Sequence, residues 1–349
     1  MKFFHISHTD MDGYGCQLIS KKIFPEGIFF NANYGLEVKL FINEVLENIQ
    51  QCSHEEKILF IITDLNLTTD ESKNLDKKIS QLKNNGFNIT LQLLDHHGTG
   101  KKSSEKYDWY FLDTNRSATQ ITYDYFCEHY TQFTQKCEPN FSKLVQAINA
   151  ADIWKEKDEL FEFGKVCMSM VTKSFEINNL LFPTQNRSYK HFLLTKALDF
   201  VDIKDGHILL DEKIYHFKKE FLNSSTKNNT LDNLSSTYLV NSLDNKKDEL
   251  TVYYKEFKGL LTYSLGNISI SANAFLKANP DFDFFMDIGR RGRTGFRANN
   301  KIDVSLLAQK LANGGGHPNA SGAAFDDFKE SSLYSDVKKY VQNKLDNCD

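Results

Sequence analysis

Residues 58–64 (ILFIITD) form an unbroken apolar run that ends in a threonine and an aspartate. Such a run is typical of a strand that is buried on both faces of a parallel sheet. A capping-box pattern at 68–71 (TTDE) follows it, and Leu75, Ile79 and Leu82 then recur at helical spacing. The segment therefore predicts a buried strand followed by an amphipathic helix.

The same alternation extends to both sides of this segment. Further short apolar runs, which read as strands, lie at 3–6, 28–30, 89–94 and 109–112. Between these runs lie stretches in which apolar residues recur at helical spacing. Strands that alternate with helices predict an α/β fold with a parallel, doubly wound sheet.

The second half of the chain has a different pattern. Residues 141–221 are predicted to be mainly helical, and the stretch 223–233 holds one apolar residue in eleven, as expected of a linker. Beyond it, β-like runs mix with one clear helix at 304–312. We expect a first domain at 1–222, a smaller mixed-sheet α/β domain at 223–349, and a cleft between them.

Composition excludes several classes of protein. The 349 residues carry 42 Lys and Arg against 46 Asp and Glu, and the net charge of −4 argues against holding long nucleic acid by bulk basicity. No window approaches the roughly 18 apolar residues of a membrane span, and the start MKFFHISHTD is too polar for a signal peptide. Six scattered cysteines without a CxxC pair favour a reducing, cytoplasmic location.

Acidic and histidine side chains gather where the predicted strands end. The first strand runs into 8–13 (HTDMDG), another ends at Asp64, and the next ends at 95–97 (DHH). The carboxyl ends of parallel strands line one crevice, so these segments should meet at one edge of the sheet. Asp152, at the end of a helical pattern, could reach the same edge. The candidate side chains are His8, Asp10, Asp12, Asp64, Asp95, His96, His97 and Asp152.

So many carboxylates in a small volume repel one another, and a divalent cation removes the conflict. Imidazole and carboxylate ligands without thiolate suit Mn²⁺ or Mg²⁺ rather than structural zinc. The ligands exceed what one ion needs, which predicts two ions that share a carboxylate and activate a hydroxide for phosphoryl transfer. Each motif alone has an ordinary interpretation as a cap or a turn, but their coincidence at strand ends favours the metal site.

A second constellation of residues lies near the C-terminus. Gly314, Gly315 and Gly316 would expose backbone N–H groups to an anion, and His317 would add a donor. The stretch 289–297 (GRRGRTGFR) carries four arginines, including Arg293 and Arg297, and guanidinium groups match phosphate oxygens. A tight turn and a solvated strand edge are the alternative interpretations of these two patterns.

These motifs together resemble the DHH phosphoesterase superfamily. The segments at 8–13 and 95–97, with Asp64 and Asp152, are similar to its four metal-binding motifs, and the glycines with His317 are similar to its DHH-associated domain. The motifs span residues 8 to 322. The opening segment is most like the short-oligoribonucleotide exonucleases of the nano-RNase B branch.

The resemblance implies roles for individual residues. It assigns one Mn²⁺ to His8, Asp10 and Asp64, and a second Mn²⁺ to Asp12, Asp64, His96 and Asp152. It further implies that His97 contacts the scissile phosphate and that Asp95 supports the two histidines. The candidate substrate-binding residues are Arg293, Arg297, Gly314, Gly315, Gly316 and His317.

The expected function is a Mn²⁺-dependent 3′→5′ exonuclease that hydrolyses short oligoribonucleotides to 5′-mononucleotides. Its partners would be short single-stranded oligonucleotides or dinucleotides, with a second copy of the chain in a homodimer. One alternative is a phosphatase or phosphodiesterase acting on 3′-phosphoadenosine 5′-phosphate, linear or cyclic dinucleotides, or polyphosphate, because the arginine cluster fits any polyanion. Another is a non-catalytic nucleotide-binding protein that retains the fold.

Overall fold

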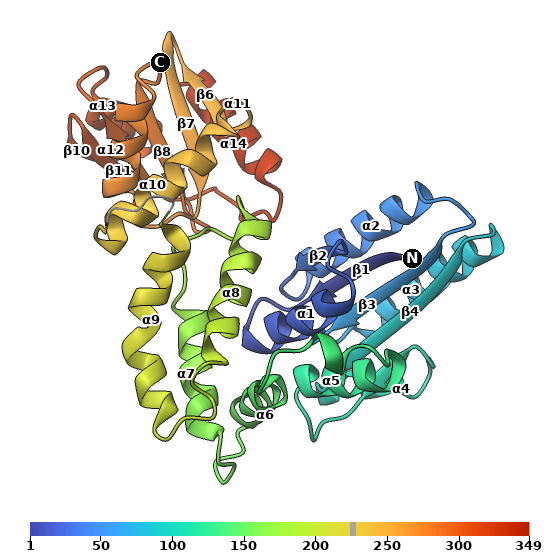
Figure 1. Cartoon of the computed structure of the whole chain (residues 1–349). Helices are drawn as coiled ribbons and strands as arrows, with labels where there is room; N and C mark the ends of the chain where they lie inside the picture. Colours follow the sequence, from blue (N-terminus) through green and yellow to red (C-terminus); the bar gives the residue numbers. More distant parts are fainter. Residues whose placement is uncertain (224–227, 349) are drawn as a thin grey trace. The chain divides into compact units, whose positions relative to one another are not determined.

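The computed structural model describes residues 1–223 and 228–348. Its contacts divide the chain into two units (Figure 1). The first unit comprises Met1–Ser174 and Arg187–Phe217, and the second comprises Phe175–Asn186 and Lys218–Asp349. Residues 224–227 of the predicted linker lie outside the described residues, and its last three residues open a helix, α10 (Leu231–Asp244).

The first unit is built on a five-stranded sheet in the order β2-β1-β3-β4-β5. All four strand pairs are parallel, which confirms the predicted α/β sheet. The strands are β1 (Lys2–Ser7), β2 (Ile28–Asn31), β3 (Lys57–Thr63), β4 (Asn88–Asp95) and β5 (Tyr110–Leu112). The strand order reverses between β1 and β3, so the crevice for a ligand is expected at their carboxyl ends.

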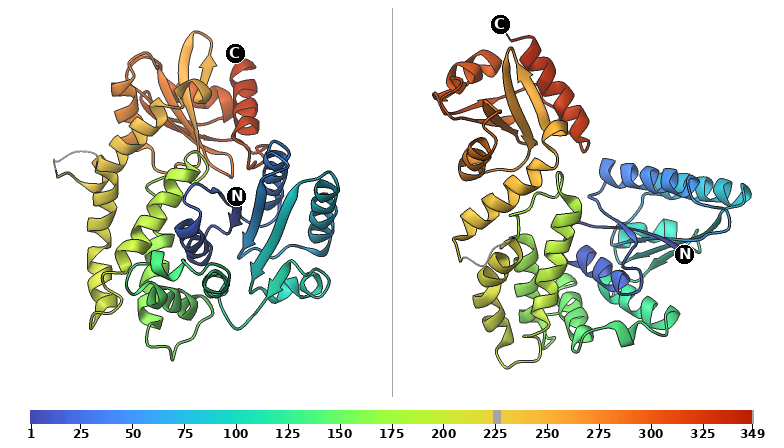
Figure 2. Two further views of the ribbon diagram at one scale, coloured as in Figure 1. Left: turned by 45° about the vertical axis from the view of Figure 1, so that its right-hand side comes forward. Right: turned by 45° about the horizontal axis from the view of Figure 1, so that its top comes forward.

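Helices cover both faces of this sheet. Figure 2 shows α2 (Leu36–Gln50) and α3 (Thr69–Asn84) on one face, with α1 (Met11–Ile23) and α5 (Ala118–His129) on the other. The predicted capping box is present at the start of α3. The apolar stripes of α2 and α3 pack on the central strands in one buried cluster, which explains why those strands are apolar throughout.

The remaining helices of the first unit begin with two short elements, a 3₁₀ turn at Gly98–Gly100 and α4 (Lys101–Ser104). A second 3₁₀ turn at Thr134–Lys136 follows α5. The predicted helical stretch is confirmed by α6 (Phe141–Asp152), α7 (Phe161–Thr172), α8 (Pro183–Ala197) and α9 (Gly206–Leu222).

The second unit holds a six-stranded mixed sheet in the order β10-β11-β9-β8-β7-β6. Only β7 and β8 pair in parallel. The strands are β6 (Thr251–Tyr254), β7 (Phe257–Tyr263), β8 (Phe284–Ile288), β9 (Arg293–Ala298), β10 (Gly315–His317) and β11 (Ala320–Ala324). Besides α10, its helices are α11 (Lys247–Leu250), α12 (Ser269–Ala278), α13 (Val304–Ala312) and α14 (Tyr334–Asp346). Buried side chains of α13 and α14 form the core with the strands.

The segment Phe175–Asn186 lies with the second unit, although the sequence pattern placed it within residues 1–222. The reason is tertiary contact. The Asn178 side-chain amide donates to the backbone carbonyls of Tyr263 and Ser264, at 3.2 and 2.9 Å. Glu176 pairs with Lys218 at 2.8 Å, and both side chains are largely shielded from solvent. A pattern of helical spacing does not report such contacts.

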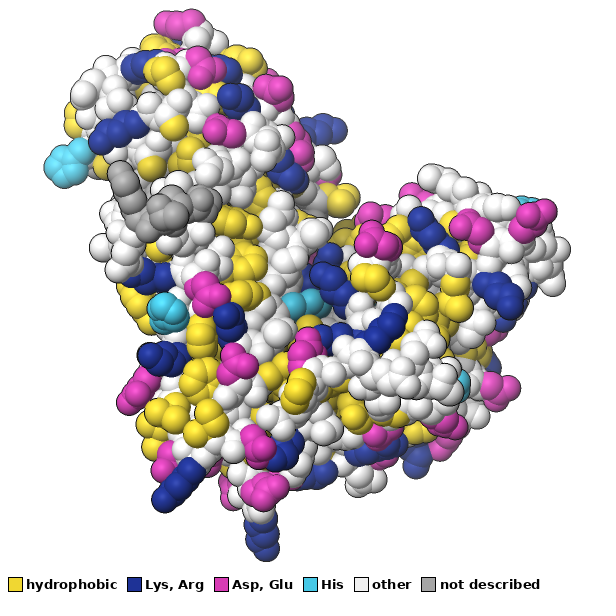
Figure 3. Space-filling model, in the orientation of Figure 1, with side chains coloured by type: hydrophobic (Ala, Val, Ile, Leu, Met, Phe, Trp, Pro, Cys, Tyr) yellow, Lys and Arg dark blue, Asp and Glu magenta, His cyan; other side chains and the backbone are white. Residues whose placement is uncertain are grey.

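The described surface carries charges of both signs, as the nearly balanced numbers of basic and acidic residues predict. On the face drawn in Figure 3, basic and acidic side chains are interspersed among polar and apolar ones. Among the described helices, none combines the length and apolar character needed to cross a bilayer.

Candidate metal centre

The turn from β1 into α1 places three candidate ligands. Asp10 is the N-cap of α1, and its carboxylate accepts from the Gly13 backbone N–H at 3.0 Å. His8 Nδ1 donates to Asp10 at 2.8 Å. A Cβ on Gly13 would overlap the His8 carbonyl oxygen, so only glycine lets the chain fold back this closely. The Asp-x-Asp-Gly pattern thus serves a helix start and the candidate site together.

Asp12 lies in the first turn of α1 and is 1% exposed. Its two oxygens accept from the backbone N–H groups of Ala118 and Thr119, at 2.7 and 2.8 Å. These groups open α5, and a helix N-terminus stabilises negative charge. The remaining lone pairs face His96, whose Nε2 lies 3.7 Å from Asp12 Oδ2. Asp12 is thus carried by α1, and the N-terminus of α5 fixes its carboxylate.

Asp64 follows β3 and occupies the centre of the cluster. It is 1% exposed, with a backbone φ of 56°, the left-handed region that aspartate tolerates at some cost. Its Oδ1 lies 3.3 Å from His96 Nε2 and its Oδ2 lies 3.7 Å from His8 Nδ1. Oδ2 is buried without a hydrogen-bond partner among the described residues. An unpaired buried carboxylate oxygen calls for a cation.

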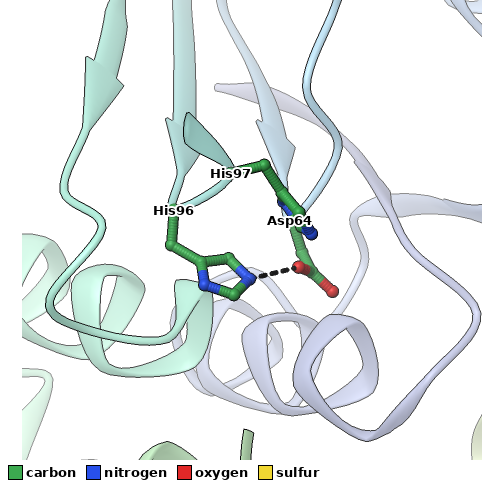
Figure 4. Close-up of side chains that lie close together, drawn as sticks. All are labelled: Asp64, His96 and His97. Atoms are coloured by element: carbon green, nitrogen blue, oxygen red, sulfur yellow. Dashed lines mark ion pairs between the residues drawn. The ribbon is translucent and has the colours of Figure 1, made fainter. Parts of the chain in front are cut away.

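His96 is the side chain on which three carboxylates converge. Its Nε2 lies within 3.7 Å of Asp12, Asp64 and Asp152. Figure 4 shows its ring turned toward Asp64. Asp152 is the last residue of α6, and its Oδ2 is another buried oxygen without a partner among the described residues.

The acidic side chains of the centre repel one another, and their burial disfavours the charged form. Burial, then the charges of Asp12 and Asp10, raise the pKa of Asp152 to about 9. Burial also raises the pKa of Asp64 well above its ordinary value, with Asp10 and Asp12 adding to it. These carboxyls cannot all ionise without a cation.

Ligand atoms within 4.8 Å of one another form three groups in the first unit. They are His8, Asp10 and Asp64; Asp12, His96 and Asp152; and Asp64, His96 and His97. The structure thus brings together all six side chains predicted as metal ligands, with Asp64 in two of the groups. The donor set of imidazole and carboxylate, with orphaned buried oxygens, fits Mn²⁺ or Mg²⁺.

His97 of the third group is paired with Asp95. His97 Nδ1 donates to Asp95 at 2.8 Å, and Asp95 is fully buried. The Tyr110 hydroxyl donates to the other oxygen of Asp95 at 2.8 Å. The hydrogen bond to Asp95 raises the pKa of His97 above its ordinary value. The Tyr34 hydroxyl lies 3.3 Å from His97 Nε2, and no sequence motif had marked this tyrosine.

The predicted substrate residues lie in the second unit. Strand register places Arg297 opposite Ala320, and Ala320 opposite His317, so both candidate side chains belong to one face of the sheet. Arg297 Nη2 donates to the Ser269 hydroxyl at the start of α12, at 2.8 Å. Arg293 begins the same strand.

The three consecutive glycines do not form an open turn. Gly315 and Gly316 belong to the short strand β10, and a Cβ on Gly314 would overlap the Gly322 carbonyl oxygen. Close strand packing therefore explains Gly314, and Gly316 packs as closely against Ala320 and Ser321. A Cβ on Gly315 would meet nothing within 4 Å, which leaves this glycine as the open one.

Comparison with known proteins identifies the family. A 3′,5′-cyclic-nucleotide phosphodiesterase of Helicobacter pylori is 42% identical over 348 residues, which cover the whole of both chains. The oligoribonuclease NrnB of Bacillus subtilis is 24% identical over 335 residues, covering 92% of this chain and 72% of that protein. The chain belongs to the DHH phosphoesterase family. It is accordingly a phosphodiesterase.

A solved structure shares the whole fold. A crystal structure of an uncharacterized protein from Helicobacter pylori G27 superposes on this DHH phosphoesterase with a TM-score of 0.91, at 41% identity over 99% of each chain. No family model matches the chain.

The raised carboxyl pKa values predict that pH and metal act together on stability. A carboxyl with a pKa of about 9 when folded and about 4 when unfolded stabilises the protein at low pH and loses that contribution as the pH rises between these values. Metal-free protein should therefore become less stable from about pH 5 to about pH 8, and Mn²⁺ should raise the Tm more at the higher pH. Thermal unfolding with chelator or Mn²⁺ measures this, and Asp152→Asn should reduce the slope. An equal slope in that variant would contradict the assignment.

Gly13→Ala should weaken Mn²⁺ binding by about tenfold or more, because its Cβ displaces the His8 backbone. Titration calorimetry measures the affinity. Gly98→Ala is the matched control, since the nearest atom to its Cβ is Thr114 Cγ2 at 3.9 Å. Equal Mn²⁺ affinity in both variants would show that the turn does not position a ligand.

Proposed function

We propose that this DHH phosphoesterase hydrolyses the P–O3′ bond of small nucleotides and that its substrates are short oligoribonucleotides, which it degrades 3′→5′ to 5′-mononucleotides. The observation that carries this proposal is the set of adjoining ligand groups. His8, Asp10 and Asp64 form one group and Asp12, His96 and Asp152 form another, while Asp64 and His96 also meet in a third group that contains His97. Two ions held against one phosphate are the usual arrangement for phosphodiester hydrolysis.

The proposed ligands are His8, Asp10 and Asp64 for one ion, and Asp12, Asp64, His96 and Asp152 for the other. When bound, Mn²⁺ or Mg²⁺ at these positions would lower the pKa of a water molecule and offset charge on the phosphate. The protein's own contribution is to hold these side chains before substrate arrives. Asp12 illustrates it, because two helix N–H groups already fix its oxygens at 2.7 and 2.8 Å.

His97 is proposed to hydrogen-bond a non-bridging phosphate oxygen through Nε2. The opposite ring nitrogen is occupied by Asp95, which fixes the ring orientation and favours the protonated form. A cationic donor at this position would stabilise the charge that accumulates on the phosphate oxygens. Tyr34, 3.3 Å from Nε2, is positioned to restrain the same ring.

Arg297, Gly315 and His317 of the second unit are proposed to bind a phosphate of a nucleotide. The guanidinium of Arg297 and the exposed His317 supply donors for phosphate on one sheet face. The cytoplasmic location and the homodimer inferred from the sequence stay predictions.

A second candidate substrate is a 3′,5′-cyclic nucleotide, because the 42% identical relative is named for that activity. The two candidates share their chemistry. Cleavage of P–O3′ in a dinucleotide or in a cyclic nucleotide leaves a 5′-phosphate on the product, and 3′-phosphoadenosine 5′-phosphate loses its 3′-phosphate at the same bond. One centre could therefore serve all three, and the rates decide between them.

Asp64→Ala should abolish turnover while the fold is kept, because Asp64 belongs to two of the ligand groups. The measurement is Mn²⁺-dependent product release from a 5′-labelled dinucleotide, a pentanucleotide, a 24-mer, a 3′,5′-cyclic nucleotide and 3′-phosphoadenosine 5′-phosphate. Asp70→Ala, an exposed acid in the first turn of α3, is the control. Faster cleavage of the 24-mer than of the dinucleotide would overturn the short-substrate proposal, and fastest cleavage of the cyclic nucleotide would favour the second candidate.

Asp95→Asn should lower kcat by about 10- to 100-fold at neutral pH. Loss of the carboxylate charge lowers the pKa of His97, so the protonated fraction falls at any given pH and the alkaline limb of the kcat profile moves to lower pH. Tyr110→Phe removes only the second hydrogen bond to Asp95 and should leave the limb in place. An unshifted limb in Asp95→Asn would exclude a protonated His97 from the rate-limiting step.

A further inference from the structure

The second unit contains a cavity of about 450 Å³, lined in part by the arginine-rich stretch 289–297. It lies where β7, β8 and β9 meet the loop before α12 (Figure 1). We call it the Asp287 cavity, and its walls are Ser264, Gly266, Asp287, Gly289, Arg293, Thr294 and Gly295.

Glycines keep this cavity open. A Cβ on Gly266 would meet nothing within 4 Å, and a Cβ on Gly289 would meet only the Arg293 carbonyl oxygen, at 3.4 Å. Gly266 also has a φ of 83°, which a side chain rarely adopts. The space at Gly289 is thus free of any packing partner that a larger residue would displace. This space is empty because the residue at position 289 has no side chain.

The polar groups of the cavity are not fully used by the protein. Asp287 is 5% exposed, and its Oδ1 accepts from the Thr262 hydroxyl at 2.8 Å and the Leu265 N–H at 3.1 Å. Among the described residues, its Oδ2 accepts from one donor, the Gly266 N–H, at 3.3 Å. A carboxylate oxygen accepts two hydrogen bonds, so Oδ2 retains room for one donor from a ligand.

Two further groups flank this acceptor. The Ser264 hydroxyl oxygen is buried without a partner among the described residues, and its backbone φ of 59° lies in the left-handed region. Strained backbone and unsatisfied polar atoms tend to gather at binding sites. Arg293 is exposed and makes no ion pair within the described part of the chain. The cavity therefore joins a buried acceptor and a hydroxyl to a guanidinium at its edge.

The cavity lies on the sheet face proposed to bind phosphate. Arg293, Gly295 and Arg297 are alternate residues of β9, so they belong to one face, at roughly 7 Å per two residues. Gly295 lines the cavity, and Arg297 is the next residue on that face. A phosphate at Arg297 would thus have its nucleoside within reach of Asp287.

We propose that the Asp287 cavity binds the nucleoside part of the nucleotide whose phosphate lies at Arg297. The group recognised is one hydrogen-bond donor, either a base N–H or a ribose hydroxyl, received by Asp287 Oδ2. The cavity contributes to substrate selection and takes no part in the chemical step. This inference rests on the proposed function in taking a nucleotide as the ligand and in placing its phosphate at Arg297.

The test measures binding of 5′-AMP, 5′-UMP, 5′-dAMP, ribose 5-phosphate and inorganic phosphate to the whole protein by calorimetry. Gly289→Leu fills the cavity, and Asp287→Asn removes the charged acceptor. Both should weaken 5′-AMP binding by about tenfold while phosphate binding is unchanged. Asp283→Asn is the control. Asp283 lies just before β8 and accepts from the Lys258 backbone N–H, but it does not line the cavity.

The smaller ligands identify the donor. If ribose supplies it, Gly289→Leu weakens ribose 5-phosphate as much as 5′-AMP. Weaker binding of 5′-dAMP to the wild type then assigns the 2′-hydroxyl, and equal binding assigns the 3′-hydroxyl. If the base supplies it, ribose 5-phosphate is unaffected. Unchanged 5′-AMP binding in a folded Gly289→Leu protein overturns the proposal, as does an equal loss for inorganic phosphate.

Hydrolysis of bis(p-nitrophenyl) phosphate, a diester without a nucleoside, separates this proposal from the proposed function. Gly289→Leu should retain the wild-type rate on this diester while its KM for a dinucleotide rises. A wild type that is inactive on every phosphodiester would contradict the proposed function. Calorimetry with 5′-AMP would still test the Asp287 cavity, because it measures binding and not turnover.

Discussion

The structure of the first unit depends on one electrostatic constraint, the burial of several carboxylates at one edge of a parallel sheet. Asp12 and Asp64 are each 1% exposed, and Asp152 is directed at the same imidazole, 3.6 Å away. A parallel sheet makes this arrangement unavoidable once acids follow neighbouring strands, because all its strands end on the same side. The repulsion is relieved by protons or by cations.

The backbone beneath the centre is arranged to keep these acids in place. His5, fully buried in β1, bonds to the hydroxyls of Ser20 and Thr63, each at 2.8 Å. Burial, with the nearby charge of Arg187, lowers its pKa to about 3, so it stays neutral and adds no charge to the site. Ser7 continues this network to the carbonyl of Gly13 at 2.9 Å. A polar network with all its groups satisfied is rigid, which suits a site whose ligands must be held before any ion binds.

Sequence reasoning reached the parallel sheet and the acids at its edge because both follow from short-range pattern. An apolar run followed by an aspartate needs only local information, and the sheet does the rest. The pairing of Gly315 and Gly316 with β11 escaped it because consecutive glycines are typical of a turn. Two further features escaped it because they depend on contacts between distant segments: the association of Phe175–Asn186 with the second unit and the approach of Tyr34 to His97. Asp287 escaped it for the same reason, since an acid within an apolar run gives no sign of a cavity around it.

A centre that attacks the P–O3′ bond has no means of telling one nucleotide from another, because that bond is common to dinucleotides, cyclic nucleotides and 3′-phosphates. Selection must come from groups that contact the rest of the substrate. Net charge cannot supply it, since the chain is acidic overall, at −4. Recognition by a few local groups binds a small ligand well and gains little from additional nucleotides, because each further phosphate meets no further cation. Under the proposed function, a preference for short substrates would follow from placing recognition in a small set of residues.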